Sequence, residues 1–492
     1  MRREFVALGG TLDNRGIRPP IGGSCYAVRV NDDWLLIDSG VYPQSGEKFK
    51  EAADCIIKIE FEEIGGEKLP ILPKCRLLDD RDFIPAHFNG LPMYDLLKDA
   101  RRIYNVVTHS HTDHNGSTPM LKQVFPNAQM LMTKATFDIS KWGWKDGLKL
   151  RRRYKQPLIY NNEDIDRLTM QVVESGQVKE YERKQVGPFD LTFFPSGHIL
   201  GGVSVLVRIQ DPTPISLFFT SDICFQDQRT LRGAPLLSGQ ILDGVDYLVT
   251  EATYAGRDEA PVDRKGTEKA LVEEIKQALK RGGKVLLPVL SIGRSAEIMS
   301  ILKQYGILND YPVWVDGSAH DLVKIYARHG ALPADAVGRN VPGRAGSTRE
   351  RQSIINDPNP CVIVASAGMV TGGWSPFYAK KLAGDKKNLI ALSCYQAKDS
   401  PGYKLLRVKK GQKVEFGEGK RRVKVEVNAR VKQFHLSSHA QGRDLLEMVR
   451  RIDPRKGVFA VHGERRGIRS FKNKLGGKYN ITPTILGRKY KV

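Results

Sequence analysis

Four side chains that can bind metal ions lie together in one short segment. They are His109, His111, Asp113 and His114, which form the pattern His-x-His-x-Asp-His. Just past a strand, the first two histidines can point to one ion while Asp113 and His114 turn to a second. Nitrogen and carboxylate ligands without a thiolate suit zinc in a catalytic site that keeps a water position open, although manganese or iron would accept the same set. The segment therefore predicts a two-metal hydrolase.

Further candidate ligands each follow an apolar run of strand length. The runs are Trp34–Ile37, Ile103–Val107, Leu191–Phe194, Ile215–Phe219 and Val458–Val461, and they lead to Asp38, His109, His198, Asp222 and His462. The carboxyl ends of parallel strands meet at one edge of a sheet, so these distant residues can converge there. A lone aspartate or histidine after a strand is usually an ordinary turn residue, but five such positions in this order favour a metal site.

The order of these residues suggests a role for each of them. His198 is expected to complete the first metal site, and His462 is expected to complete the second. Asp222 is expected to bridge the two ions. Asp38 is expected to orient the attacking water or a ligand rather than to bind metal as a main ligand.

The pattern of apolar residues changes near residue 255. Tyr247–Val249 is the last strand-like run of the first half, and a helix capped by Thr267 is expected to follow. A strand at Val285–Val289 and a helix at Ser295–Leu302 then continue an alternation that predicts a parallel α/β unit as far as Tyr395. The later elements are expected to be strands at Lys413–Phe416 and Val423–Val427, a helix at Arg443–Arg451 and a closing strand at Val458–Val461. Strands at Cys55–Phe61 and Ile71–Cys75 would lie in a region that has no assigned function.

The charge balance indicates a polyanionic partner. The 492 residues include 77 Lys and Arg against 55 Asp and Glu, which gives a formal net charge of +22. Such an excess favours nucleic acid through counterion release. No apolar run reaches the roughly 20 residues that cross a bilayer, and the N-terminus lacks the features of a signal peptide. A cytoplasmic protein without membrane contact is expected, and its six cysteines, none in a CxxC pair, are expected to be reduced thiols.

The arrangement resembles the metallo-β-lactamase superfamily and, more narrowly, its β-CASP nucleases. The segments that carry the narrower resemblance are Tyr247–Tyr254 for motif A, Phe434–Ala440 for motif B, Ala460–Glu464 for motif C, Ser291–Glu297 for the GRAQE helix start, and Ala365–Met369 for the SPGM turn. Ser196–Gly202 has the GHxLG form that is typical of the cleavage and polyadenylation endonuclease group, and it is unlike the RNase J segment. Ser221 stands where the family usually has glycine, a change that is not expected to affect ligation.

The resemblance implies an α/β fold in which a metallo-β-lactamase αββα sandwich is interrupted by an α/β β-CASP domain. The expected boundaries are 1–254 and 404–492 for the two parts of the sandwich and 255–403 for the inserted domain. It also implies a ribonuclease that uses two Zn²⁺ ions, with Mn²⁺ as a second candidate. A histidine at motif C is typical of RNA-processing members, whereas DNA-processing members tend to carry an apolar residue there.

The resemblance further implies the proton donor. His439 is expected to be the general acid, and Glu251 is expected to hydrogen-bond its other nitrogen and favour the imidazolium. With Asp38 and Asp113 these residues make up the expected catalytic set.

Several positive side chains are candidates to hold the RNA. Arg294 lies at an expected helix start, where it could bind phosphate, and Arg465 and Arg466 directly follow motif C. The runs Lys149–Lys155, Lys409–Lys410 and Lys420–Arg422 are further candidates, and Trp142, Trp144 and Tyr154 could stack on bases.

Three other functions remain open at this stage. A DNA nuclease of the same branch shares the catalytic residues. A small-molecule hydrolase of the wider superfamily would explain the metal ligands but not Glu251, His439 or the charge. A non-catalytic scaffold subunit would be expected to lack ligands, and here none is missing. Endonuclease action on single-stranded RNA is favoured over 5′→3′ exonuclease action, and the sequence is compatible with a homodimer without deciding the oligomeric state.

Overall fold

The computed structural model describes most of the chain in two compact units. The described residues are 2–11, 22–41, 60–64, 67–71, 91–153, 158–174, 182–235, 242, 244–257, 263–341, 347–416 and 422–492. Unit 1 comprises Met1–Gln226, Gly233–Ala260 and His439–Val492, and unit 2 comprises Asp227–Arg232 and Pro261–Ser438. Of the residues singled out above, Cys55, Cys75, Tyr154, Lys155, Lys420 and Arg421 lie outside the described ranges.

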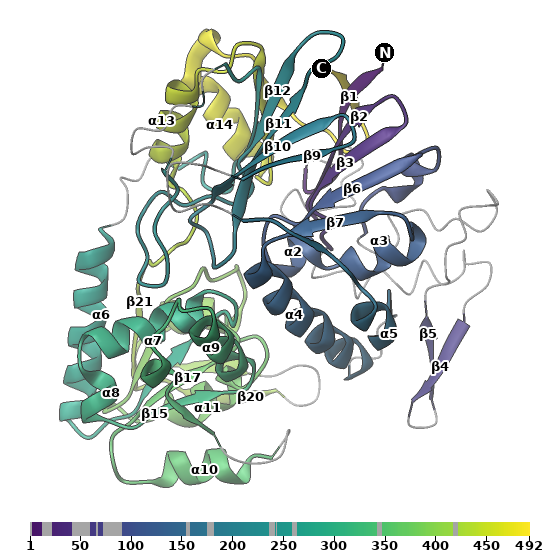
Figure 1. The fold of residues 1–492 in the computed structure, drawn as a ribbon. Coiled ribbons are helices and arrows are strands. Elements are labelled where there is room, and N and C mark those ends of the chain that lie inside the picture. Colours follow the sequence, from purple (N-terminus) through teal and green to yellow (C-terminus); the bar gives the residue numbers. More distant parts are fainter. Residues whose placement is uncertain are drawn as a thin grey trace. The chain divides into compact units, whose positions relative to one another are not determined.

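Unit 1 contains two seven-stranded sheets (Figure 1). The first has the order β24 (Lys489–Lys491), β1 (Arg3–Gly9), β2 (Cys25–Val30), β3 (Asp33–Ile37), β6 (Arg102–Val106), β7 (Gln129–Met132) and β8 (Gln171–Val172). The second has the order β23 (Ile481–Pro483), β22 (Gly457–Val461), β13 (Tyr247–Glu251), β12 (Ile215–Phe219), β11 (Val203–Ile209), β10 (Phe189–Pro195) and β9 (Arg183–Val186).

Alternating side chains bury both faces of each sheet. In β1, Phe5 and Ala7 belong to the core that the two sheets share, whereas Val6 and Leu8 belong to a second core on the outer face. The helices α3 (Thr118–Val124) and α4 (Lys134–Arg153) supply buried residues on the side of the first sheet. The helices α13 (Gly442–Ile452) and α14 (Arg465–Leu475) cover the second sheet through one apolar cluster. These layers form the αββα sandwich that the sequence predicts.

The strands that carry the candidate ligands run in matching directions within each sheet. β3 is parallel to β6, and β12, β13 and β22 are parallel to one another. β10 is antiparallel to β11, which is antiparallel to β12, so β10 runs in the same direction as β12. The ligands therefore follow the ends of strands from two facing sheets. The expectation of a single sheet edge was too simple, because the sandwich brings two such edges together.

Unit 2 is built on a parallel sheet with the order β16 (Arg339–Asn340), β15 (Val313–Asp316), β17 (Val362–Ala365), β14 (Val285–Pro288), β18 (Leu389–Leu392) and β21 (Arg430–Gln433). Its helices include α6 (Arg264–Lys280), α7 (Arg294–Gln304), α9 (Ser318–Arg328), α10 (Arg349–Asn356), α11 (Ser375–Leu382) and α12 (Pro401–Arg407). The predicted parallel α/β unit is thus present.

Two expected positions in unit 2 were wrong. The first helix begins at Arg264, capped by the Asp263 carboxylate, which accepts a 2.9 Å hydrogen bond from the backbone N–H of Gly266. Thr267 therefore lies inside that helix. The unit also extends to Ser438 rather than ending near 403, because β21 pairs with β18 and completes the sheet. The hairpin of β19 (Lys413–Phe416) and β20 (Val423–Glu426) adds Val414 and Phe416 to the apolar core that packs on the sheet of unit 2.

Other differences concern short elements. Among the described residues between 41 and 101, β4 (Glu60–Ile64) and β5 (Glu67–Ile71) form a hairpin. It overlaps the expected strands at Cys55–Phe61 and Ile71–Cys75 at one end of each, and the rest of both expected strands lies outside the described residues. The strand β22 does not close the chain, since α14, β23 and β24 follow it. β23 and β24 have three residues each and lie at the edges of their sheets. Such short strands show too little hydrophobic periodicity to be predicted. The described cysteines, Cys25, Cys224, Cys361 and Cys394, are buried and form no disulfide with one another, as expected of thiols. No helix in the described ranges is both long and apolar enough to cross a membrane.

Candidate metal centre

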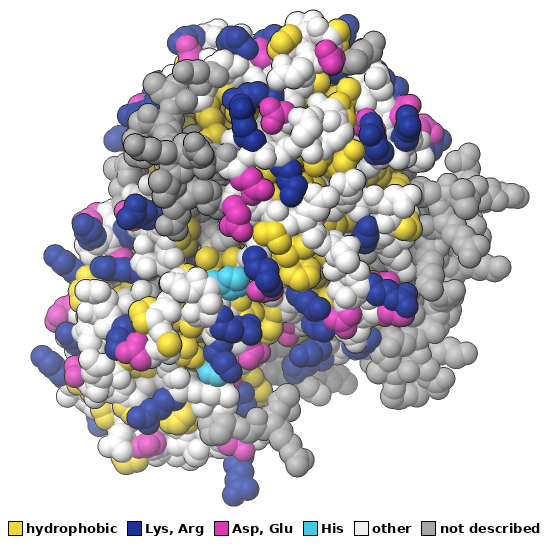
Figure 2. All heavy atoms as spheres, viewed as in Figure 1, with side chains coloured by type: hydrophobic (Ala, Val, Ile, Leu, Met, Phe, Trp, Pro, Cys, Tyr) yellow, Lys and Arg dark blue, Asp and Glu magenta, His cyan; other side chains and the backbone are white. Residues whose placement is uncertain are grey.

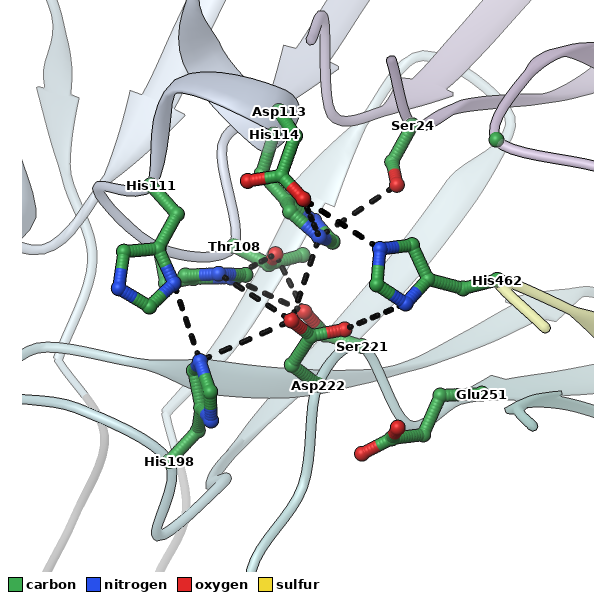
Figure 3. Close-up of polar contacts among 12 residues, drawn as sticks. Ser24, Thr108, His111, Asp113, His114, His198, Ser221, Asp222, Glu251 and His462 are labelled. Atoms are coloured by element: carbon green, nitrogen blue, oxygen red, sulfur yellow. Dashed lines mark hydrogen bonds and ion pairs between the residues drawn. The ribbon is translucent and has the colours of Figure 1, made fainter. Parts of the chain in front are cut away.

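Two clusters of metal-binding side chains in unit 1 lie on either side of Asp222. One consists of His109, His111, His198 and Asp222, and the other consists of Asp113, His114 and His462. Within each cluster the potential ligand atoms lie within 4.8 Å of one another. Figure 3 shows Asp222 between His198 and His462, with its carboxylate facing both clusters. The structure thus brings together every residue for which the sequence predicts metal ligation.

The first cluster consists of the buried imidazoles of His109 and His198, the partly buried imidazole of His111 and the buried carboxylate of Asp222. His198 Nε2 lies 3.1 Å from His111 Nδ1 and 3.6 Å from Asp222 Oδ2, and His109 Nε2 lies 3.7 Å from the same oxygen. Burial, reinforced by the positive neighbour His114, holds the pKa of His109 well below its usual 6.5. Burial also lowers the pKa of His111 to about 4. Both side chains are therefore neutral at physiological pH, which is the form that binds metal.

The second cluster has a stronger negative field. His114 Nε2 lies 3.4 Å from Asp222 Oδ2, and His462 Nε2 lies 3.4 Å from Asp113 Oδ2. Burial disfavours a charged His114, but the carboxylates of Asp222, Asp38 and Asp113 outweigh burial and raise its pKa well above 6.5. The same carboxylates would attract a divalent cation to this position.

Two unsatisfied atoms test whether these residues fit metal ions. His109 Nε2 and Asp222 Oδ1 are buried and have no hydrogen-bond partner among the described residues. A buried polar atom without a partner is costly and rare, and a bound cation would satisfy both atoms. The donors are imidazoles and carboxylates without thiolates, as in catalytic zinc sites. The residues present therefore fit a pair of metal ions that share Asp222.

Asp38 contacts a ligand histidine, as the sequence predicts. His114 Nδ1 donates to Asp38 Oδ2 over 2.6 Å, which leaves His114 Nε2 facing Asp222. The buried carboxylate also accepts hydrogen bonds from the Thr108 backbone N–H at 2.7 Å and from Thr108 Oγ1 at 2.8 Å. This arrangement fixes the orientation of one ligand ring.

Two supporting residues were not identified from the sequence. Thr108 Oγ1 lies 3.2 Å from His109 Nδ1, and it also forms a 2.6 Å hydrogen bond with Ser221 Oγ. Ser221 Oγ in turn lies 3.3 Å from His109 Nδ1. Ser221 is thus more than a neutral replacement of glycine, since its hydroxyl lies beside a ligand ring. In the sequence, this role of Ser221 was indicated only by its position directly before Asp222.

The backbone of the site is held in an unusual conformation. Asp38, Ser221 and His462 have φ angles of 70°, 54° and 49°, in the left-handed region that non-glycine residues seldom adopt. Such conformations persist where surrounding contacts enforce them, and they are concentrated at functional sites. Beside them, a Cβ on Gly40 would lie 1.7 Å from the carbonyl oxygen of Asp113, so only glycine allows this close approach.

Glu251 and His439 form the expected proton-donor pair. His439 Nδ1 lies 3.1 Å from Glu251 Oε2, and His439 Nε2 lies 4.0 Å from Asp222 Oδ2. Glu251 is buried and also accepts a 3.0 Å hydrogen bond from the backbone N–H of Ile223. Burial disfavours the imidazolium, but the carboxylates of Glu251 and Asp222 outweigh it and raise the pKa of His439 to about 10. The ring is therefore a protonated group beside the clusters.

The candidate nucleic-acid contacts have different environments. Arg465 and Arg466 are exposed at the start of α14, four and five residues after β22 ends at Val461. Arg294 belongs to unit 2, is only 8% exposed and donates to Ser438 Oγ over 3.4 Å. Trp144 cannot stack on a base, contrary to expectation, because it is buried and its indole N–H donates to the Asn115 carbonyl. Lys and Arg side chains are present on the viewed face of each unit (Figure 2).

Comparison with known proteins supports the same fold and chemistry. Residues 296–405 match the Beta-Casp domain, and residues 424–485 match the Zn-dependent metallo-hydrolase RNA specificity domain. The RNase J-like protein of Methanocaldococcus jannaschii is 30% identical over 464 residues, which cover 92% of each chain. Transcription termination factor FttA of Pyrococcus abyssi is 28% identical over 416 residues, which cover 80% of this chain and 62% of FttA. The chain thus spans less than two thirds of the length of FttA.

A solved structure shows the same overall fold. It is that of a protein of unknown function from Enterococcus faecalis V583, which superposes with a TM-score of 0.59 at 13% identity over the full length of both chains.

Proposed function

Because the chain belongs to the metallo-β-lactamase β-CASP nuclease family, we propose that it is a zinc-dependent ribonuclease that hydrolyses RNA phosphodiester bonds with two metal ions. The relatives named RNase J-like and FttA, and the match to an RNA specificity domain, support an RNA substrate. The single observation that carries the proposal is the arrangement of two ligand clusters that share Asp222 next to the Glu251–His439 pair.

The residues divide the chemistry between them. His109, His111 and His198 would hold one ion, Asp113, His114 and His462 would hold the other, and Asp222 would bridge them. Two bound Zn²⁺ ions would supply an activated water and neutralise the charge of the phosphate. Mn²⁺ is compatible with the same nitrogen and oxygen ligands.

His439 would give a proton to the leaving oxygen. Glu251 accepts from Nδ1, which leaves Nε2 as the nitrogen that faces the clusters. Asp38 would keep His114 in place and thereby act on the reaction indirectly. Arg465 and Arg466 would bind phosphates beside the centre, and Arg294 would contribute only if the RNA reaches unit 2.

The proposal includes the mode of action. Endonucleolytic cleavage of single-stranded RNA is favoured, with 5′→3′ exonuclease action as the alternative. The histidine at position 462 favours RNA over DNA through the family resemblance. A small-molecule hydrolase would need the metal ligands but would have no use for the Glu251–His439 pair. A cytoplasmic location is proposed because the four described cysteines form no disulfide with one another, and a homodimer is compatible with the sequence.

The variant His439→Ala tests the catalytic assignment. We expect RNA cleavage to fall by roughly two to four orders of magnitude, the usual contribution of a general acid, while zinc content stays unchanged. The matched control is His435→Ala, an exposed histidine four residues earlier, which should cleave at the normal rate. Undiminished cleavage by His439→Ala would remove this residue from the mechanism.

The substrate assignment needs matched nucleic acids. Circular RNA, linear 5′-monophosphate RNA and single-stranded DNA of the same sequence would be incubated with the zinc-loaded protein. Opening of the circle is expected. Degradation of linear RNA alone would indicate an exonuclease, and preference for DNA would overturn the assignment to RNA.

A further inference from the structure

A pocket of unit 1 lies away from the metal clusters. It has a volume of about 330 Å³ and is lined by residues at the beginnings of β13 and β22, by β24 and by two residues around β23. Tyr247 and Gly457 are the first residues of β13 and β22, whereas Glu251 and His462 lie at the other ends of these strands. At about 3.3 Å per residue, the five steps from Gly457 to His462 span roughly 16 Å. We call this surface the Tyr247–Tyr490 pocket.

Aromatic rings form a row in this pocket. The Tyr247 ring stacks on Phe459 with centroids 5.4 Å apart, and Phe459 lies 5.2 Å from the Tyr490 ring. Phe459 is buried in the core, whereas Tyr247 and Tyr490 are partly exposed. The backbone N–H of Ile485 donates to the Tyr490 hydroxyl over 2.9 Å, which helps to hold that ring. The two tyrosines therefore offer ordered, partly open aromatic surface.

Positive charges lie over the rings of both tyrosines. Lys456 Nζ lies 6.0 Å from the centre of the Tyr247 ring, and the Arg488 guanidinium lies 5.5 Å from that of Tyr490. Lys489 and Lys491 also line the pocket, and no acidic residue does. Asp246 lies 3.8 Å from Lys456 but is held more closely by Arg455 at 3.0 Å. Within the described part of the chain, no carboxylate pairs with Arg488.

From this geometry we propose that the Tyr247–Tyr490 pocket is a second binding site for single-stranded RNA, which holds a part of the substrate that is not being cleaved. Aromatic rings flanked by cations are the combination by which proteins hold single strands without reading their sequence. Phosphates would lie against Lys456 and Arg488, and bases would contact the parts of the tyrosine rings that these cations and the core leave open. The inference rests on the proposed ribonuclease function, since it assumes that RNA is the substrate.

Unit 2 has a pocket with a different lining. The lining combines Arg281, Lys386, Lys410 and Arg430 with aliphatic side chains. Arg430 is paired with Glu274, and no aromatic residue lines the pocket. It therefore has charge but no surface for a base, and the Tyr247–Tyr490 pocket is the better site for a nucleic acid.

The double variant Lys456→Ala/Arg488→Ala tests the inference in the zinc-loaded protein. Both side chains are exposed, and Arg455 remains to pair with Asp246, so the fold should be retained. We expect KM for a long single-stranded RNA to rise roughly three- to tenfold with kcat unchanged. The slope of log affinity against log salt should decrease by about 1.4, because each phosphate contact to a single strand contributes about 0.7. Cleavage of an oligonucleotide too short to reach the pocket should be unaffected.

The matched control is Arg450→Ala/Lys472→Ala, which removes the same charges from exposed positions on α13 and α14. Its KM and salt slope should change much less. Equal effects of the two double variants would show a general charge effect and overturn the site. Unchanged cleavage kinetics of long RNA in Lys456→Ala/Arg488→Ala would also overturn the site. A variant that loses self-association but binds RNA normally would assign the pocket to protein contact and overturn the site too. Absence of RNA cleavage by the unmodified protein would instead refute the proposed function.

Discussion

At the scale of single residues, the centre contains histidines whose pKa values are shifted in opposite directions. His109 and His111 are kept neutral by burial, as metal ligands must be. His439 lies in the same centre but keeps its proton, because Glu251 holds one of its nitrogens. Identical side chains thus take different roles according to the carboxylates around them.

The first prediction concerns the pH dependence of Glu251→Gln. A general acid must be protonated, so activity falls as the pH rises through its pKa. The Glu251 carboxylate raises the pKa of His439, and its replacement by a neutral amide should lower that pKa. We therefore expect the alkaline limb of the pH–rate profile to move to lower pH, by one unit or more.

The profile of kcat/KM between pH 6 and 10, about the range of histidine and lysine titration, would measure this shift. The control Glu447→Gln removes an exposed carboxylate from α13 and should leave the limb in place. A limb that does not move in Glu251→Gln would show that Glu251 does not govern the proton on His439.

At the scale of elements, one buried glutamate organises the start of α7. Glu297 pairs with Arg264 of α6 at 2.7 Å, and both side chains are buried. It also accepts hydrogen bonds from the backbone N–H groups of Arg229 and Thr230, at 2.9 and 3.1 Å. One carboxylate therefore joins two helices of unit 2 to the 227–232 segment. This gives the glutamate of the GRAQE-like segment a structural role that its sequence did not reveal.

The second prediction is that Glu297→Gln destabilises unit 2 by about 3 kcal/mol at neutral pH, since it leaves Arg264 buried without its counter-charge. Burial raises the pKa of Glu297, but Arg264 and the backbone donors outweigh burial and lower it overall. A lowered pKa stabilises the fold above the unfolded value of about 4.3, and this contribution is lost as the pH falls. The difference between variant and parent should therefore shrink below about pH 4.

Denaturant unfolding at several pH values would measure both effects. The control Glu273→Gln changes an exposed carboxylate of α6 and should unfold like the parent. A stability difference that stays constant with pH would contradict the assigned charge effect.

At the scale of the whole molecule, the centre is assembled by tertiary structure alone. Its residues follow strands of two sheets and are spread from Asp38 to His462. No short segment contains all the side chains of either cluster, so the clusters form only when unit 1 is folded. Carboxylates gathered around Asp222 repel one another unless histidines or cations neutralise them.

The third prediction follows for metal removal. Chelation should abolish RNA cleavage and lower the midpoint of thermal unfolding, and added zinc should restore both. A ligand present at a thousand times its Kd stabilises the native state by about 4 kcal/mol. Calorimetry with and without zinc would measure this, and His439→Ala should retain the zinc-dependent shift, since His439 is not assigned as a ligand. Stability that does not respond to zinc would contradict the metal centre.

The sequence by itself predicted which side chains converge, because the candidates lie shortly after apolar runs of strand length and hydrophobic periodicity is a local property. The strand–helix alternation predicted the parallel unit, whereas the sandwich was implied by the family resemblance. Tertiary structure alone decided the contacts of Thr108, Ser221 and Glu297, which depend on what lies across the fold. It also decided the boundary at Ser438, which is set by the pairing of β21 with β18. The Tyr247–Tyr490 pocket likewise joins residues from distant segments that no spacing could relate.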